Sequence, residues 1–135
     1  MKKLTLTVLV AALVLLIIQS CSKGGGGGGC SETAKTVTSD PPNGSVQPPA
    51  PGPTYPLVVT ITGNMPAAGV TIEVKAHPSS SATNFFTETR NSTTTTNNFT
   101  ITNTPAATSC KVDIVVTSKS CATNKVTLSY TYSSK

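Results

Sequence analysis

Residues 70–76 read Val-Thr-Ile-Glu-Val-Lys-Ala, and this stretch decides the fold class. Apolar residues at every second position alternate with polar ones, which is typical of a β-strand with one buried face. The same period of two recurs from residue 57 to the end, whereas a helical period never lasts beyond one turn. The predicted strands cover residues 57–61, 70–76, 83–90, 98–102, 110–116 and 126–132. Six or seven short strands in one small domain, residues 56–135, predict an all-β fold: a single antiparallel β-sandwich.

Part of this pattern resembles a known family. Residues 99–105 read Phe-Thr-Ile-Thr-Asn-Thr-Pro, and residues 110–116 continue Cys-Lys-Val-Asp-Ile-Val-Val. The passage resembles the fifth and sixth strands of fibronectin type III domains, where an aromatic-x-Ile pair leads through a proline turn to a tyrosine eleven residues on. Cys110 stands in place of that tyrosine, Thr104 replaces a core leucine, and the chain has no tryptophan. The resemblance implies an immunoglobulin-like sandwich with an adhesive or spacer role.

The amino terminus has the pattern of an export signal. Met1-Lys2-Lys3 is positively charged, and residues 4–18 are apolar apart from threonine. Such a run spans ~22 Å as a helix, short of the ~30 Å hydrocarbon core, so residues 1–20 are interpreted as a signal peptide. Ser20-Cys21 resembles the bacterial lipobox, which implies that Cys21 is diacylated and becomes the mature amino terminus. Ser22 resembles the position that directs Gram-negative lipoproteins to the outer membrane; an ordinary secretory signal remains the alternative.

Residues 21–55 are predicted to form a disordered tether between Cys21 and the sandwich. Gly24–Gly29 are six consecutive glycines, which predict a chain of minimal stiffness. The prolines between residues 41 and 56 predict an extended, semi-rigid second half. Neither half carries the apolar pattern of a packed core.

Three cysteines remain once Cys21 is assigned to lipid, and three cannot all pair within one chain. Cys110 and Cys121 are the obvious candidate disulfide in an exported domain. Yet Cys110 begins a predicted strand and Cys121 follows it, which places them ~20 Å apart, whereas a disulfide needs Cα atoms within ~7 Å. Cys110 is then a small buried residue, and Cys30 and Cys121 are free, paired together or paired with another chain.

Composition excludes several classes of function. The net charge of +5 falls to about +3 without Lys2 and Lys3, and the remaining basic residues are scattered, which argues against nucleic-acid binding. The single histidine, His77, has no ligand spacing with the cysteines, so we expect no metal or other cofactor.

We also expect the protein to have no enzymatic activity. The carboxylates of Glu73, Glu88 and Asp113 fall on predicted outward positions, where they balance nearby lysines, and no Gly-x-Ser-x-Gly motif is present. His77 beside Pro78 and three serines is interpreted as a turn residue. Tyr55, Phe85, Tyr130 and Tyr132 are the only candidates for stacking on a sugar ring.

One polar run is a candidate binding loop, because loops on a rigid scaffold commonly carry function. A plain hairpin loop is the alternative. The candidate residues are Asn91, Thr93, Thr94, Thr95, Thr96 and Asn97.

Together these features predict a lipid-anchored envelope protein that displays a non-catalytic β-sandwich in a structural or binding role. Membrane lipid, reached through acylated Cys21, is the one predicted partner. Two alternatives stay open: a cell-surface carbohydrate-binding or adhesin module, and an accessory or inhibitor protein of an envelope enzyme. The sequence identifies no protein or glycan partner and no oligomeric state.

Overall fold

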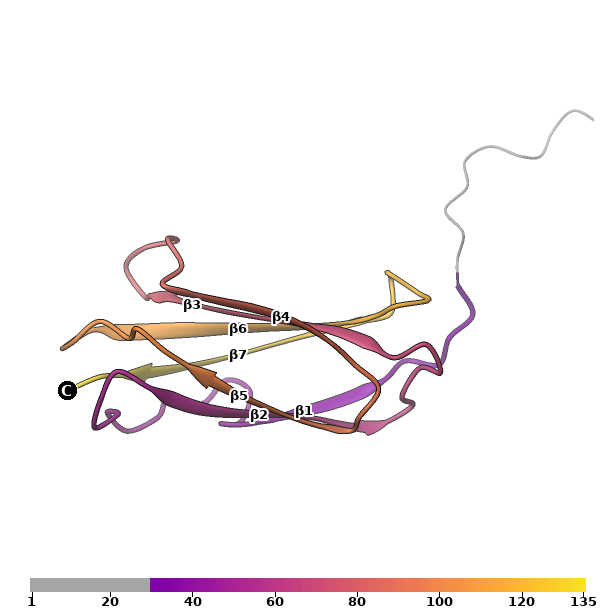
Figure 1. Cartoon of the computed structure of the whole chain (residues 1–135), viewed down its shortest axis with the longest axis horizontal. Helices are drawn as coiled ribbons and strands as arrows, with labels where there is room; N and C mark the ends of the chain where they lie inside the picture. The colour runs from indigo at the N-terminus through magenta and orange to yellow at the C-terminus, as the bar shows by residue number, and fades with distance from the viewer. Residues whose placement is uncertain (1–29) are drawn as a thin grey trace, which may run out of the picture.

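The computed structural model describes residues 30–135, and the predicted signal peptide, Cys21 and the glycine run lie outside this range. The described chain is all-β, without a helix, and forms two packed sheets (Figure 1). The predicted antiparallel β-sandwich is therefore confirmed. Its strands are β1 (Thr36–Asp40), β2 (Tyr55–Gly63), β3 (Val70–Pro78), β4 (Phe86–Ser92), β5 (Thr96–Ile101), β6 (Ser109–Ser118) and β7 (Lys125–Ser133).

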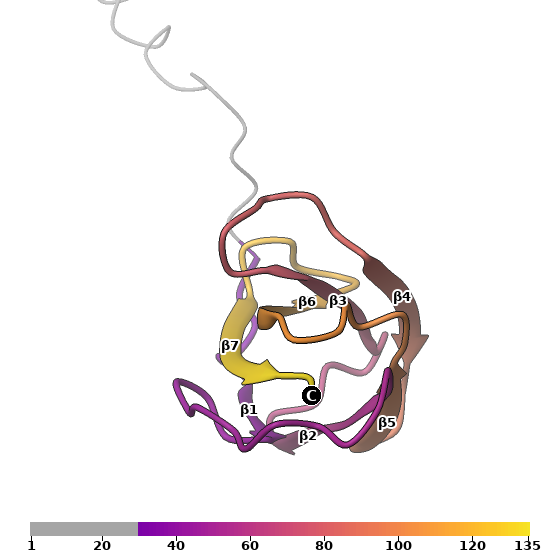
Figure 2. The ribbon, with the colours of Figure 1, turned by 90° about the vertical axis from the view of Figure 1, so that its left-hand side faces the viewer.

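The two sheets contain three and four strands. Their orders are β1-β2-β5 and β4-β3-β6-β7, and every pairing between these strands is antiparallel. The end-on view shows the two layers facing each other, with β4 and β5 at one side and β1 and β7 at the other (Figure 2). Strands β3 and β6 form the centre of the larger sheet, and they pair along nine residues from Val70↔Ser118 to Pro78↔Cys110.

Alternating burial explains why these segments form strands. In β3, Val70, Ile72, Val74 and Ala76 are fully buried, while the residues between them are half-exposed. The inward residues of β2, β5, β6 and β7 meet these side chains between the sheets. Tyr130 and Tyr132 are the largest fully buried side chains, and the Tyr132 hydroxyl lies 2.7 Å from Oγ1 of Thr104.

The boundary predicted at residue 56 is wrong, because most of the predicted tether belongs to the domain. Residues 36–40 form β1, whose Val37 enters the core. Residues 43–50 then follow the outer edge of β7, with parallel bridges at Val46↔Thr131 and Ala50↔Ser134. Ala50 is also buried in the core. Backbone pairing with β7 holds this segment in place, so it needs no apolar alternation of its own.

The proline-rich segment also protects an edge of the sandwich. The amides of Gln47 and Ala50 donate to β7 carbonyls at 2.9 and 2.7 Å. Pro48, Pro49 and Pro51 have no amide to offer a further strand. Their presence beside β7 is a common way of keeping a sheet edge from pairing with another chain.

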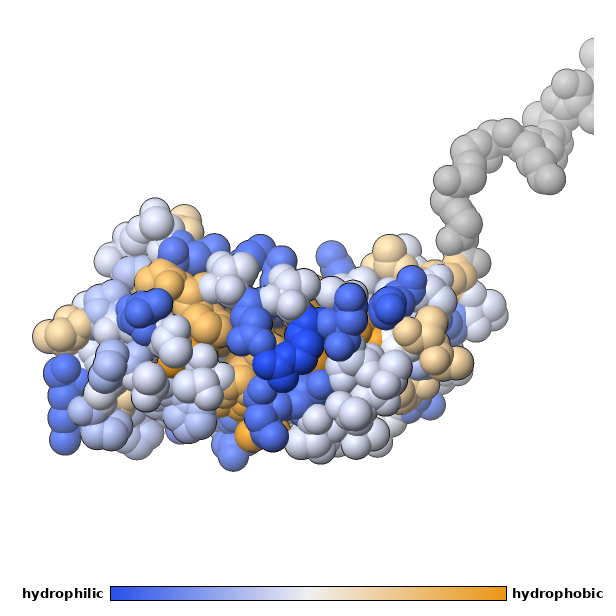
Figure 3. All heavy atoms as spheres, viewed as in Figure 1, coloured by the Kyte–Doolittle hydropathy of each residue, from blue (hydrophilic) through white to orange (hydrophobic). Residues whose placement is uncertain are grey.

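Strands β4 and β5 leave the opposite side of the sandwich more open. Directly paired residues share a face, so the pairing Val74↔Glu88 places Glu88 on the core-facing side of β4. The prediction that Glu88 points outward is therefore wrong. On the face that shows β4 and β5, strongly hydrophilic side chains cross the middle and apolar atoms stay visible beside them (Figure 3).

The chain enters and leaves the sandwich at opposite ends. Cys30 lies at the end formed by the β2–β3, β4–β5 and β6–β7 connections, which we call the entry end (Figure 1). Lys135 and the β3–β4 and β5–β6 connections lie at the other end, the distal end. The part of the chain described here has no helix that is both long and apolar enough to span a bilayer.

Candidate functional site: the disulfide-linked entry end

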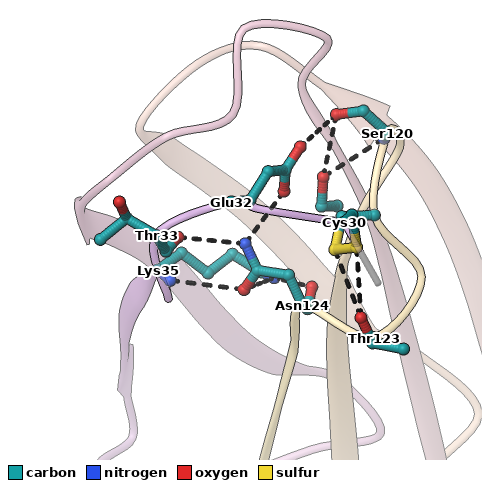
Figure 4. Close-up of a disulfide and its surroundings, with 9 residues drawn as sticks. Cys30, Glu32, Thr33, Lys35, Ser120, Thr123 and Asn124 are labelled. Carbon is teal, nitrogen blue, oxygen red and sulfur yellow. Dashed lines mark hydrogen bonds between the residues drawn. A yellow bond between two sulfur atoms is a disulfide. The ribbon is translucent and has the colours of Figure 1, made fainter. Parts of the chain in front are cut away.

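A disulfide joins Cys30 to Cys121 at the entry end (Figure 4). The two Cα atoms are 5.5 Å apart, although 91 residues separate them in the sequence. The bond links the residue at which the described chain begins to the β6–β7 connection. Cys30–Cys121 was one of the pairings left open, while the Cys110–Cys121 candidate is wrong.

Strand β6 explains why Cys110 cannot reach Cys121. Cys110 is the second residue of this ten-residue strand, which runs from the distal end to the entry end. Its thiol is free and fully buried. Burial raises the pKa of the Cys110 thiol, so it stays protonated and is a poor nucleophile.

Polar side chains fasten the segment between Cys30 and β1 to the same connection. The Lys35 ammonium donates to the backbone carbonyl of Asn124 and, at 3.2 Å, to its side-chain Oδ1. Asn124 Nδ2 in turn donates to Glu32 Oε2 at 3.0 Å. Ser120 donates its hydroxyl proton to the other oxygen of Glu32. Figure 4 shows these groups pointing toward one another around the disulfide.

The environment of this cluster changes the pKa values of its two ionisable groups in physically distinct ways. Hydrogen bonds from Ser120, and further ones from Ser118 and Asn124, lower the pKa of Glu32. Burial lowers the pKa of Lys35, and the negative charge of Glu32 partly opposes that effect. Lys35 is only 4% exposed, so its amine depends on the two oxygens of Asn124 in place of water.

Two shallow grooves flank this cluster. One, of about 250 Å³, is lined by the disulfide together with Lys35, Thr123 and Lys125, among others. The other, of about 230 Å³, lies between Glu32 and the β2–β3 connection at Asn64–Pro66. Both are open and mixed in polarity, unlike the enclosed apolar pockets that bind small organic ligands.

The candidate binding loop also lies at the entry end. It joins β4 in one sheet to β5 in the other, so the simple hairpin alternative is wrong as well. Its polar groups satisfy one another: Asn97 is buried and donates to the Thr94 carbonyl, while Ser92 Oγ accepts from the Thr94 amide. The Thr95 carbonyl accepts from the Ile61 amide at 2.8 Å. The other five candidate residues, Asn91 and Thr93 to Thr96, are exposed.

At the distal end, His77 makes two polar contacts that leave it no free nitrogen. Nδ1 lies 2.9 Å from the Pro78 carbonyl oxygen, and Nε2 lies 3.2 Å from Asp113 Oδ2. The Pro78 carbonyl raises the pKa of His77 most; burial opposes this, and Asp113 adds to it. Two acceptors favour the doubly protonated ring. Ser79 pairs instead with Ser109, at 3.1 Å between hydroxyls.

The other candidate catalytic residues are also engaged with neighbours. Glu73 forms an ion pair with Lys75 at 2.7 Å, and Asp113 forms one with Lys111 at 2.9 Å. Glu88 pairs with Arg90. Within residues 30–135, no three His, Cys, Asp or Glu side chains gather as metal ligands.

Most of the aromatic candidates are part of the core. Tyr130 and Tyr132 are buried, and the half-buried Tyr55 ring packs against Tyr132 at 4.3 Å between centroids. Phe85 is half-buried at the distal end, where its amide donates to the Ala76 carbonyl. Phe85 lies in the connection between β3 and β4, and Tyr55 is the first residue of β2.

Sequence reasoning missed Glu32, Lys35 and Asn124, which organise the entry end. The available signal was the change in composition after Gly29, where Ser-Glu-Thr-Ala-Lys replaces glycine before any strand begins. Comparisons with protein-family models, with curated proteins and with solved structures found no match to this chain.

Proposed function

We propose that this chain is a lipoprotein of the bacterial cell envelope, anchored through acylated Cys21, whose β-sandwich has a structural or binding role without catalysis. The observation that carries this proposal is the disulfide at Cys30, nine residues after Cys21. It ties the start of the described chain to one end of a compact domain.

The disulfide supports export from the cytoplasm. Structural disulfides persist in oxidising compartments and are rare where thiol reductants are abundant. Cys30–Cys121 therefore agrees with a signal peptide at residues 1–20, and the neighbouring Cys21 is then free for acylation. Two acyl chains are enough for stable membrane anchoring, whereas one is marginal.

The orientation of the domain relative to its proposed anchor supports a display role. An anchor at the entry end leaves the distal end, with its β3–β4 and β5–β6 connections, as the part that projects outward. Any partner in the envelope would then meet residues 79–85 and 102–108 first. The candidate loop at residues 91–97 is on the membrane side in this arrangement, which makes it the weaker choice for a binding surface.

The hydrogen bonds and ion pairs of the titratable side chains support a non-catalytic role. A general base needs a free lone pair within reach of its substrate, and His77 has both nitrogens occupied. The three carboxylates on β3, β4 and β6 each face a cation on a neighbouring position.

We further propose kinship with fibronectin type III domains. The residues that carry the resemblance form β5, a cross-over between sheets and β6, as a sandwich of that kind requires. Cys110 fills the position of the expected tyrosine as a fully buried side chain.

Intact mass of the protein extracted from membranes tests the anchor and the disulfide together. We expect the mass of a chain that starts at Cys21 plus its acyl groups. Alkylation of the unfolded protein should label one thiol, Cys110, before reduction and three after it. A mature chain without acyl groups would contradict the anchor, and three labelled thiols before reduction would contradict the disulfide.

A further inference from the structure

The net positive charge of the described domain is concentrated at its entry end. Away from that end, four basic residues are balanced by four acidic ones: Lys75, Arg90, Lys111 and Lys135 against Asp40, Glu73, Glu88 and Asp113. The entry end holds the remaining charges, which are Lys35, Lys119 and Lys125 against Glu32. The excess of two positive charges therefore belongs to this end alone.

Two of these lysines are available to a partner. Lys119 and Lys125 are exposed at the two ends of the β6–β7 connection, and neither forms an ion pair within residues 30–135. Lys35, in contrast, is buried and donates to Asn124. The one acid at this end, Glu32, accepts hydrogen bonds from Ser120 and Asn124.

The disulfide fixes these lysines close to the point of anchoring. Lys119 and Lys125 flank Cys121, which is bonded to Cys30. Nine peptide units join Cys30 to Cys21, and even a fully extended chain of that length spans at most ~32 Å. An acylated Cys21 lies in the bilayer, so the entry end stays within reach of the lipid headgroups.

We infer that the entry end of the sandwich docks on an anionic lipid surface through Lys119 and Lys125, which bind the phosphates of the headgroups. The inference rests on the proposed anchor, because the short connection is what holds the two lysines at the surface. The distal end then projects along the long axis of the sandwich, away from the membrane (Figure 1).

Vesicle binding of the unacylated chain tests this surface independently of the anchor. The probe is the chain from residue 21 with Cys21→Ser, mixed at low salt with phosphatidylcholine vesicles that contain or lack about 30% phosphatidylglycerol. We expect binding only to the anionic vesicles. Lys119→Gln together with Lys125→Gln should lower the partition coefficient about 30-fold, since each lysine near an anionic surface contributes a factor of about five.

The matched control removes the same charge elsewhere, with Lys75→Gln and Lys111→Gln on the outer face of the larger sheet. It should lower the partition coefficient far less. Equal losses in the two variants would show a general charge effect and overturn the docking surface, as would equal binding to both kinds of vesicle. The anchor and the docking surface can fail separately. If the protein from cells carries no acyl groups but vesicle binding still depends on Lys119 and Lys125, the proposed anchor is wrong and the proposed docking surface stands.

Discussion

The guanidinium group of Arg90 lies over the ring of Phe99, with 4.4 Å between the guanidinium carbon and the ring centroid. Arg90 belongs to β4 and Phe99 to β5, so this contact closes the open side of the sandwich between the two sheets. The same guanidinium donates to the Asn98 carbonyl at 2.9 Å. One side chain thus covers an aromatic core residue and satisfies an edge carbonyl.

Replacing Arg90 with alanine should lower the free energy of unfolding by about 1–2 kcal/mol, because it removes both the cation–π contact and the hydrogen bond. Urea titration of both proteins measures the difference. Lys75→Ala, which breaks only an exposed ion pair, should change stability by less than about 0.5 kcal/mol. Equal effects would show that Arg90 acts as an ordinary surface charge.

The two buried tyrosines of β7 should respond differently to the loss of their hydroxyls. Tyr130 has a buried hydroxyl without a hydrogen-bond partner among the described residues, so Tyr130→Phe should leave stability unchanged or raise it by about 1 kcal/mol. Tyr132→Phe strands the Thr104 hydroxyl, which is 6% exposed, and should cost about 1–2 kcal/mol. Thermal unfolding of the pair decides the matter; a larger loss for Tyr130→Phe would contradict it.

Gly69 should tolerate no side chain. Its φ is +80°, and a Cβ placed there would lie 2.4 Å from the carbonyl oxygen of Ser92. Gly69→Ala should therefore cost about 1–3 kcal/mol, through both the left-handed backbone and the clash. Gly52→Ala is the matched control, since a Cβ at Gly52 meets nothing within 4 Å. Denaturant unfolding that shows equal stabilities would refute the proposed packing.

The disulfide should contribute strongly to stability because it closes a long loop. Cys30→Ser with Cys121→Ser should lower the free energy of unfolding by about 2–4 kcal/mol. Either single substitution should cost nearly as much as the double, since each breaks the same bond. Limited proteolysis should then cut between Cys30 and β1 before any other site. Unchanged stability in the double variant would show that the Lys35–Asn124 contacts suffice.

His77 should make stability depend on pH. Its pKa is raised in the folded protein, so its contribution is fully present below the unfolded value of about 6.5 and is lost as pH rises through the folded pKa. The stability gap between the native protein and His77→Gln should therefore be larger at about pH 5.5 than at about pH 8.5. Chemical denaturation at both pH values measures it, and a gap that grows with pH would contradict the assigned contacts.

Much of the sandwich could be predicted from the sequence because each strand carries a local pattern of alternating apolar and polar residues. Val70 to Ala76 alternates with period two whatever its neighbours are, since one face must be buried and the other solvated. The same holds for the inward residues Val112, Ile114 and Val116 of β6. The length of the predicted strand also indicated that Cys110 and Cys121 lie too far apart to form a disulfide.

Only the tertiary structure shows which segments meet at the entry end and what covers the two open edges of the sandwich. Residues 43–50 join β7 through backbone hydrogen bonds, which leave no trace in an apolar pattern. Glu88 faces inward because β4 lies at an open edge, where a charged side chain can cover the core and still reach water. Cys30 meets Cys121 because the segment leading into β1 starts at the end of the sandwich where the β6–β7 connection lies. The two cysteines are 91 residues apart in the sequence, and no local sequence signal records their contact.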